Sequence, residues 1–581
     1  MLEAPIDAGP AEEIKAAGMR VVRVGRTPVL VLWHEGAFHA VDNRCPHMGF
    51  PLDKGDVSDG LLDCHWHHAR FDVTCGKTLD LWADDVDAYG VEERDGRVWI
   101  DPNRPVEDPV ARGRERLHRG LEDNLGLVVS KAVRKLDGAD ATEQIVQMAA
   151  RHGALERSDG WSASLSILAA MANVLPALTT TDRHRALSHA CREVARATAG
   201  RPRRRPVPAL KGTKRSRRGL TDWFRETVEV RDARGAERIL AALVDGHGAA
   251  AAIGAVFAAC TDHRYSDGGH TLDYAAKCAE LLDHVGDPNG ELASLLITSL
   301  VPQLAQMARM EERSSWRRPV DVAALVASGS DRLPDDLPEK GGPVRDEQGL
   351  VTILLGEDPE AALDALLEGL RGGTDAAALA DAVVDAATWR VLRFGSVNEA
   401  ADWDTVHHTL TYANAVAEGL RRSPTPELFR GVLDAAASVY LDRFLNVPAA
   451  QMTPAKDPPA TEKDLNQCLL GLYDRRSEVD AVSSVAWGWL QSGGDPEALL
   501  RTIARAVLRE DSGFHAFQQL DIAWRQLRRR GAESAAAHRS LVAAARWLAA
   551  HYPTVRAREQ TFRIARRLER GDRLHEVGDS P

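Results

Sequence analysis

The sequence changes character once, close to residue 105, and this change limits the architecture more than any other feature. The first hundred or so residues contain short β-branched and apolar runs separated by turn signals, among them Asp95-Gly96. The rest of the chain is rich in Ala, Leu, Arg, Glu and Asp with helical periodicity. We therefore expect a multidomain protein, with a small all-β domain over residues 1–105 and a large all-α domain, a helical array or bundle, over residues 106–581.

Composition excludes several classes of protein. The chain is 44% hydrophobic and 27% charged, which is typical of soluble globular proteins, and it lacks an unbroken apolar run of about 18 residues, so we expect no membrane partner. A net charge of −12 argues against nucleic acid as a partner. Acidic residues near the start and seven thinly spread cysteines favour a reducing compartment, and we expect the protein to be cytoplasmic.

Two short loops of the predicted β domain each contain one cysteine and one histidine. Cys45-Pro-His47 is followed, after sixteen intervening residues, by Cys64-His-Trp-His67. A structural zinc site usually takes paired cysteines from one loop and paired histidines from another. One thiolate and one imidazole from each loop is the ligand set of a Rieske [2Fe–2S] cluster, in which one iron takes both cysteines and the other takes both histidines.

On this motif, about residues 15–103 resemble a Rieske domain. The resemblance implies that Cys45 and Cys64 bind the buried iron and that His47 and His67 bind the outer iron. It also implies one-electron transfer. Because the chain has neither the glycine fingerprint of a dinucleotide-binding domain nor a phosphate-binding loop, we expect an external NAD(P)H-dependent reductase or ferredoxin reductase to supply the electrons.

Departures from the family pattern indicate which members of the family this domain is most similar to. Rieske proteins of respiratory complexes have one extra cysteine in each loop, joined as a disulfide, and the matching positions here are Phe50 and Trp66. The domain is therefore closer to the ferredoxins and oxygenase components of the family. In the second loop, His65 replaces the usual proline and His68 the usual glycine, which leaves the geometry of that backbone open.

The familiar Rieske oxygenases join their cluster to a mixed α/β catalytic domain with the motif Asp-x-x-His-x4-His. The nearest match here, Asp182-x-His184-x4-His189, is one residue short and lies in a uniformly helical region. We interpret this match as chance, and the helical region resembles no family that we recognise.

An internal similarity indicates a different kind of site in the helical region. Thirteen-residue segments that begin at His270 and His408 share eight positions, which predicts two related helical units at about 220–326 and 350–450. In each segment a tyrosine follows the histidine by four positions and so shares its helix face. Tyr274 and Tyr412 are therefore candidate catalytic residues.

Histidines and carboxylates on facing helices can bind non-haem iron. A second iron site is therefore one interpretation of the repeat, and helix capping or ordinary core packing of the histidines is the other. The candidate ligands are His270, His408, Asp267, Asp404, His189 and His515.

Two functions from different classes follow. The first is a Rieske-dependent oxidoreductase, an oxygenase whose cluster feeds electrons to a metal or oxygen-activating site in the helical domain, where a small organic substrate is oxidised. The second is a ferredoxin-like electron carrier or redox sensor whose helical array docks a partner protein.

Overall fold

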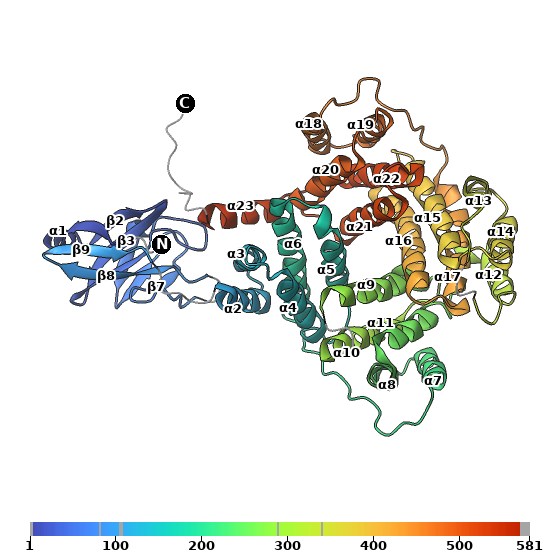
Figure 1. Cartoon of the computed structure of the whole chain (residues 1–581), viewed down its shortest axis with the longest axis horizontal. Helices are drawn as coiled ribbons and strands as arrows, with labels where there is room; N and C mark the ends of the chain where they lie inside the picture. Colours follow the sequence, from blue (N-terminus) through green and yellow to red (C-terminus); the bar gives the residue numbers. More distant parts are fainter. Residues whose placement is uncertain (1–3, 81–82, 104–108, 287–289, 338–340, 570–581) are drawn as a thin grey trace. The chain divides into compact units, whose positions relative to one another are not determined.

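The computed structural model shows a chain that divides into two compact units (Figure 1). Unit 1 comprises residues 1–145 and 557–581, and unit 2 comprises residues 146–556. Within these units the structure describes residues 4–80, 83–103, 109–286, 290–337 and 341–569. The predicted boundary between residues 105 and 106 falls outside the described residues. Unit 1 extends past it, because helices from both ends of the chain pack with the β domain.

The β domain contains two antiparallel sheets. The larger has six strands in the order β1 (Ile6–Pro10), β9 (Arg97–Asp101), β8 (Ala88–Arg94), β4 (Ala37–Asp42), β3 (Thr27–His34) and β2 (Met19–Val24). The smaller consists of β5 (Asp56–Ser58), β6 (Leu61–Asp63) and β7 (Arg70–Asp72). One short helix, α1 (Ala11–Ala17), joins β1 to β2. The predicted β-rich N-terminal domain is confirmed.

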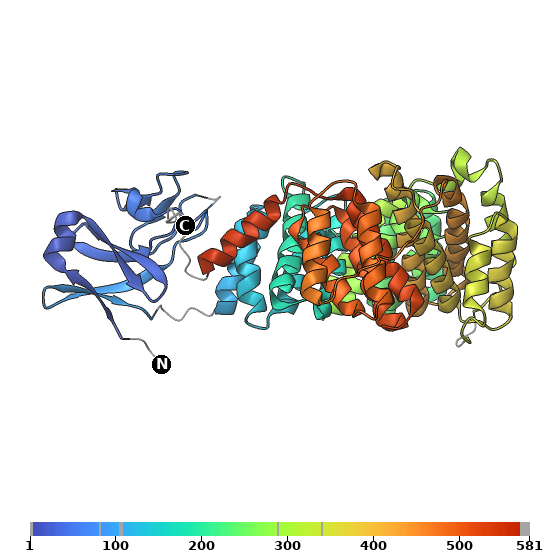
Figure 2. The ribbon, with the colours of Figure 1, turned by 90° about the horizontal axis from the view of Figure 1, so that it is seen from above.

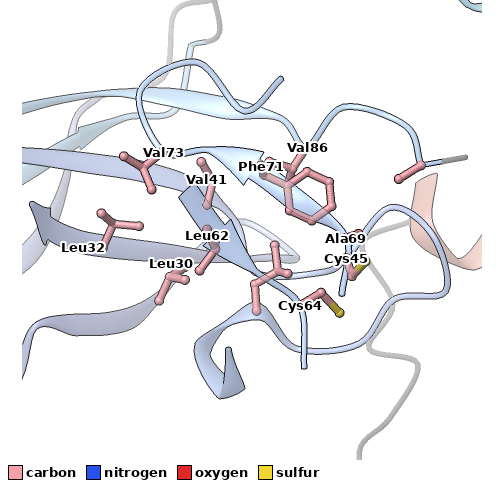
Figure 3. Close-up of a cluster of buried hydrophobic side chains, with 12 residues drawn as sticks. Leu30, Leu32, Val41, Cys45, Leu62, Cys64, Ala69, Phe71, Val73 and Val86 are labelled. Atoms are coloured by element: carbon pink, nitrogen blue, oxygen red, sulfur yellow. The ribbon is translucent and has the colours of Figure 1, made fainter. Parts of the chain in front are cut away.

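Strand β3 separates two apolar cores, because successive side chains of a strand point to opposite faces. Val29 and Val31 belong to one core, and Leu30 and Leu32 belong to the other. The second core also contains Cys45 and Cys64, which Figure 3 shows near one another at its edge. The motif cysteines are therefore anchored in the packed interior of the β domain.

Three helices complete unit 1: α2 (Pro109–Glu122), α3 (Gly126–Asp137) and α23 (Ala557–Glu569), of which α3 contacts both others. Buried Asp84, in the loop before β8, accepts a hydrogen bond from Lys131 of α3 at 2.6 Å. Arg44 donates to the carbonyl oxygen of Leu568 in α23 at 2.7 Å. The β domain is thus tied to helices that precede and follow the whole of unit 2 in the sequence.

Unit 2 is built from helices, and no strand occurs among its described residues. Figure 2 shows them standing side by side with their axes roughly aligned. In chain order they are α4 (Thr142–Leu155, which begins in unit 1), α5 (Ala163–Val174), α6 (Thr180–Thr198), α7 (Arg217–Glu229), α8 (Ala233–Cys260), α9 (His270–His284), α10 (Glu291–Thr298), α11 (Val301–Gln306), α12 (Val322–Ser330), α13 (Glu347–Leu354), α14 (Pro359–Arg371), α15 (Ala376–Leu392), α16 (Ala400–Arg422), α17 (Pro426–Asp442), α18 (Glu462–Tyr473), α19 (Val479–Gln491), α20 (Pro496–Arg509), α21 (Phe514–Arg530) and α22 (Ala535–His551). The predicted large helical region is confirmed.

Four of these helices form a closed ring at the centre of unit 2. Helix α5 packs against α9 and α21, and α16 packs against the same two helices from the other side (Figure 1). The two similar segments found in the sequence lie in α9 and α16, which are therefore direct neighbours. Whether residues 220–326 and 350–450 are related units stays a prediction.

Helix α8 is long and apolar enough, by length and composition alone, to cross a membrane, and among the described residues it is the one helix that is. Of its most apolar stretch, 61% is buried inside the protein, as expected for a core helix, which meets the same criteria. Gly248, with φ of 83°, interrupts its helical geometry. The absence of a membrane partner stays a prediction.

Candidate functional site

The two motif loops of the β domain have the same backbone turn. The N–H of Gly49 donates to the carbonyl oxygen of Cys45 at 2.6 Å, and the N–H of His68 donates to that of Cys64 at 2.8 Å. Both turn residues are left-handed, with φ of 79° at Gly49 and 61° at His68. The loop geometry that the sequence left open is therefore retained, with a histidine in a conformation that favours glycine.

This strained position gives a testable prediction. We expect His68→Gly to raise the free energy of unfolding by about 1 kcal/mol, because the left-handed conformation costs an L-residue roughly that much. The His68 ring is exposed and lies 3.6 Å from Asp63, a surface contact of small value. Denaturant unfolding of the cluster-loaded protein measures the effect. His65→Gly, in the same loop but without a left-handed φ, is the control and should not stabilise; equal gains from both variants would contradict the explanation.

The side chains of the four motif residues converge. Cys45 and Cys64 are buried and their thiols share a hydrogen bond, which lowers the pKa of Cys64 to about 6 and raises that of Cys45. The imidazole rings of His47 and His67 lie 4.7 Å apart, centroid to centroid. Two sulfur and two imidazole donors from two loops fit the donor set of a [2Fe–2S] cluster. The ligand roles of the individual residues stay a prediction.

An aromatic pair stands where respiratory members of the family have their disulfide. The rings of Phe50 and Trp66 are 5.8 Å apart, and Trp66 is also 4.4 Å from the ring of His67. Trp66 is 42% exposed, an unusual value for so large an apolar side chain. The histidine edge of the candidate cluster site therefore carries an aromatic surface.

A second convergence of side chains lies in unit 2. His270 is the first residue of α9, His408 lies within α16, and His515 is the second residue of α21. One ring nitrogen from each lies within 4.8 Å of the others, and the Nε2 atoms of His408 and His515 are 3.1 Å apart. Three of the predicted second-site candidates, more than 100 residues apart in sequence, are thus brought together by the central helix ring.

The surroundings keep two of these imidazoles neutral. Burial, followed by the neighbouring histidine charges, lowers the pKa of His270 to about 4 and that of His408 to about 3. Neutral imidazoles have a free nitrogen lone pair at pH 7, which is what a metal ion requires. Asp404, one turn before His408, accepts from Nδ1 of His515 at 3.1 Å and so orients its Nε2 toward the cluster. Carboxylates orient metal-binding histidines in this way.

Of the other candidates, Asp267 and His189 do not join the three histidines, whereas Tyr274 lies beside one of them. Asp267 accepts hydrogen bonds from the N–H of Ala308 and the hydroxyl of Thr271, away from the three histidines. His189 packs on Phe517 on another face of α21. The Tyr274 ring stacks on His270 with centroids 5.8 Å apart.

Tyr412, the other catalytic candidate, is not at the histidines. Its hydroxyl is buried and donates to Asp434 at 3.2 Å, and Asp434 also pairs with Arg264. His407, next to His408, has both ring nitrogens occupied by the side chains of Gln518 and Gln519. Neither residue is free to reach a metal held by the three histidines.

A buried charge network, which sequence reasoning missed, lies further along the same helices. Lys277 of α9 binds Glu280 at 2.9 Å and also pairs with Asp521 of α21. Arg525 of α21 binds Glu280 at 2.8 Å and Glu418 of α16 at 2.9 Å. In each helix a network residue follows its histidine by ten positions: Glu280, Glu418 and Arg525. The three histidines contact one another at one level of the ring, and the charged residues ten positions later contact one another at a second level. Helices α9, α16 and α21 therefore run in the same direction.

Comparisons with known proteins identify the β domain. The family model for the Rieske [2Fe–2S] domain matches residues 4–86, and no family model matches the helical region. Residues of this domain are 32% identical over 96 residues to the ferredoxin component of an alkene monooxygenase system from Xanthobacter autotrophicus, covering 16% of this chain and 79% of that one. The ferredoxin subunit of a 3-phenylpropionate/cinnamic acid dioxygenase from Photorhabdus laumondii is 37% identical over 92 residues, covering 15% of this chain and 86% of that one.

A relative that is much longer than these ferredoxins matches over a stretch of similar length. Apoptosis-inducing factor 3 from Homo sapiens is 33% identical over 90 residues, which are 15% of each chain. This chain therefore spans about one seventh of the length of that relative. The matched domain binds a [2Fe–2S] cluster. Through this N-terminal domain, the chain belongs to the Rieske [2Fe–2S] family.

Proposed function

We propose that this protein is a Rieske-dependent oxidoreductase of the oxygenase type, with its oxidation site in unit 2. The Rieske domain gives the chain an electron-transfer role, because a [2Fe–2S] cluster passes one electron at a time. The observation that carries the proposal is the convergence of His270, His408 and His515, whose ring nitrogens lie within 4.8 Å of one another. Three imidazoles leave further coordination positions open for oxygen or substrate.

The metal we assign to the three histidines is non-haem iron. Imidazole ligands suit iron, copper, zinc and nickel. Zinc has no redox chemistry, so it cannot accept the electrons that a Rieske domain supplies. Burial keeps His408 and His270 neutral. Asp404 accepts from Nδ1 of His515 and so fixes its tautomer. Each of the three rings therefore has a nitrogen lone pair available to bind a metal ion.

The proposed reaction inserts oxygen into a small organic substrate. In a monooxygenation, one atom of O2 enters a C–H bond and the other leaves as water, with two electrons and two protons consumed. We assign the electrons to an external NAD(P)H-dependent reductase or ferredoxin reductase. The relatives support this role: the matched domains are ferredoxin parts of an alkene monooxygenase and of a 3-phenylpropionate/cinnamic acid dioxygenase.

Iron content tests the proposal. We expect about three irons per chain in the full-length protein after reconstitution, two in the cluster and one at the histidines. His270→Ala and His515→Ala should each reduce the count to about two while leaving the visible spectrum of the cluster unchanged. His247→Ala, at an exposed position of α8, is the control and should retain all three.

The alternative function predicts a different count. An electron carrier whose helices dock a partner protein would hold about two irons, and His270→Ala would not change that number. A count of two in the wild-type protein, with an intact cluster spectrum, would therefore contradict the proposed oxidation site. A third metal that proves to be zinc would contradict it as well.

A further inference from the structure

A pocket of about 740 Å³ in unit 2 shares a wall with the three-histidine cluster. His408 lines this pocket, together with the aromatic side chains of Tyr265, Trp316 and Phe444. The rings of Tyr265 and Trp316 are stacked, with centroids 5.9 Å apart. The volume and the aromatic walls are those of a small-molecule site. A flat molecule held between these aromatic walls would lie beside His408.

One buried carboxyl oxygen in the pocket wall has no hydrogen-bond donor among the described residues. Asp442, the last residue of α17, is 4% exposed, and its Oδ2 has no hydrogen-bond partner in the described part of the chain. Burial raises the pKa of this carboxyl to about 7, against the lowering effects of hydrogen bonding with Thr409 and of the Arg390 charge. A buried carboxyl oxygen without a donor is costly, so a ligand that supplies a donor gains binding energy there.

The charges around Asp442 select the kind of donor. The nearby guanidinium of Arg390 is occupied by the carbonyl oxygens of Val439 and Leu355, yet its positive charge remains. Arg390 is not in the pocket wall, but Arg313 and Arg318 are. Three arginines disfavour a cationic amine, whereas a neutral hydroxyl meets no repulsion. The other carboxylate of the wall, Asp267, already accepts hydrogen bonds from Ala308 and Thr271.

We propose that this pocket is the substrate site and that it takes an aromatic compound whose hydroxyl group donates a hydrogen bond to Asp442. The inference deepens the proposed function, since the bound ring would lie next to the histidine that we assign to the metal. Asp442 acts here as a specificity residue. It holds the substrate and does not take part in the oxidation.

Binding of three probes of similar size tests this inference on the full-length, reconstituted protein. Equilibrium dialysis compares 2-naphthol, 2-methylnaphthalene and 2-naphthylmethylamine. We expect wild-type protein to bind 2-naphthol at least about tenfold more tightly than either of the others, the effect of one hydrogen bond to a buried carboxyl. Leu445→Trp, which fills the pocket from its wall, should abolish binding of all three and so locate the site.

The Asp442 variants separate recognition from folding. Asp442→Leu should lose the preference for 2-naphthol and bind 2-methylnaphthalene as tightly as wild type, which shows that the pocket still forms. Asp442→Asn keeps one acceptor oxygen and should retain part of the preference. Equal binding of 2-naphthol and 2-methylnaphthalene by wild type, no binding of either, or a preference that survives Asp442→Leu would overturn the inference.

The outcome is independent of the oxidation site. In His270→Ala the preference for 2-naphthol should persist, because His270 does not line the pocket. If the protein shows an Asp442-dependent preference but holds only two irons, the substrate pocket is supported and the proposed oxidation site is contradicted. If it holds three irons but shows no such preference, the oxidation site is supported and the substrate pocket is contradicted.

Discussion

Cys64→Ala is expected to remove the [2Fe–2S] cluster completely. The Cys64 side chain is buried at the edge of the β core, beside Cys45 and with no third cysteine in that core. Cys64 is a predicted ligand of the buried iron, and without its thiolate that iron would lack a ligand that no neighbour can replace. We expect iron content to fall by about two per chain, together with loss of acid-labile sulfide and of the paramagnetic signal of the reduced protein.

A second cysteine of the same domain provides the control. Cys75 is exposed and three residues past β7, and Cys75→Ala should keep the full cluster signal. His67→Ala should abolish the wild-type signal as Cys64→Ala does, because His67 is the predicted ligand of the outer iron. If the reduced signal of Cys64→Ala or His67→Ala matched that of wild type, the four-residue ligand assignment would be wrong.

Lys277→Met is expected to give the largest loss of stability. The ammonium group is buried between Glu280 and Asp521, and its removal leaves both carboxylates near one another with Arg525 as the cation that still pairs with both. Breaking a buried ion pair from one side costs about 3–5 kcal/mol. Denaturant unfolding followed by far-UV circular dichroism should show this loss in the helical transition. Lys463→Met, at an exposed position of α18, should change it by less than about 0.5 kcal/mol.

A double variant identifies the cause. Lys277→Met combined with Asp521→Leu removes both charges of the pair and should recover part of the loss, because fewer carboxylates remain uncompensated. Strictly additive losses would mean that Lys277 contributes through packing alone. A loss below about 1 kcal/mol in the single variant would show that water enters the network.

The Rieske motif and the pairing of His270 with His408 could be predicted from the sequence. The motif depends on the local spacing of its residues, and the pairing depends on an internal repeat. The sequence indicated His515 as a candidate but could not place it, since the contact of α21 with α9 and α16 depends on how distant helices close the ring. The buried charges left a trace, the polar positions Asp273, Lys277 and Glu280 on one side of α9, that helical periodicity could have revealed.

Other features had no local signal. Asp442 lies 34 positions past His408 in a different helix, and only the assembled pocket brings the two into one wall. Tyr412 occupies the same position in the second segment as Tyr274 does in the first, yet its hydroxyl donates a hydrogen bond to Asp434. Similar sequence on two helices therefore predicted the histidine contact and not the role of the tyrosines, because the neighbouring helices differ.

The pairing of α23 with the β domain has a consequence for biosynthesis. Arg44, beside the first motif cysteine, donates to the carbonyl oxygen of Leu568, which is synthesised after all of unit 2. Unit 1 therefore cannot be complete until the ribosome has made the entire helical unit. A chain interrupted within unit 2 therefore lacks α23 and, with it, the partner of the Arg44 side chain next to Cys45.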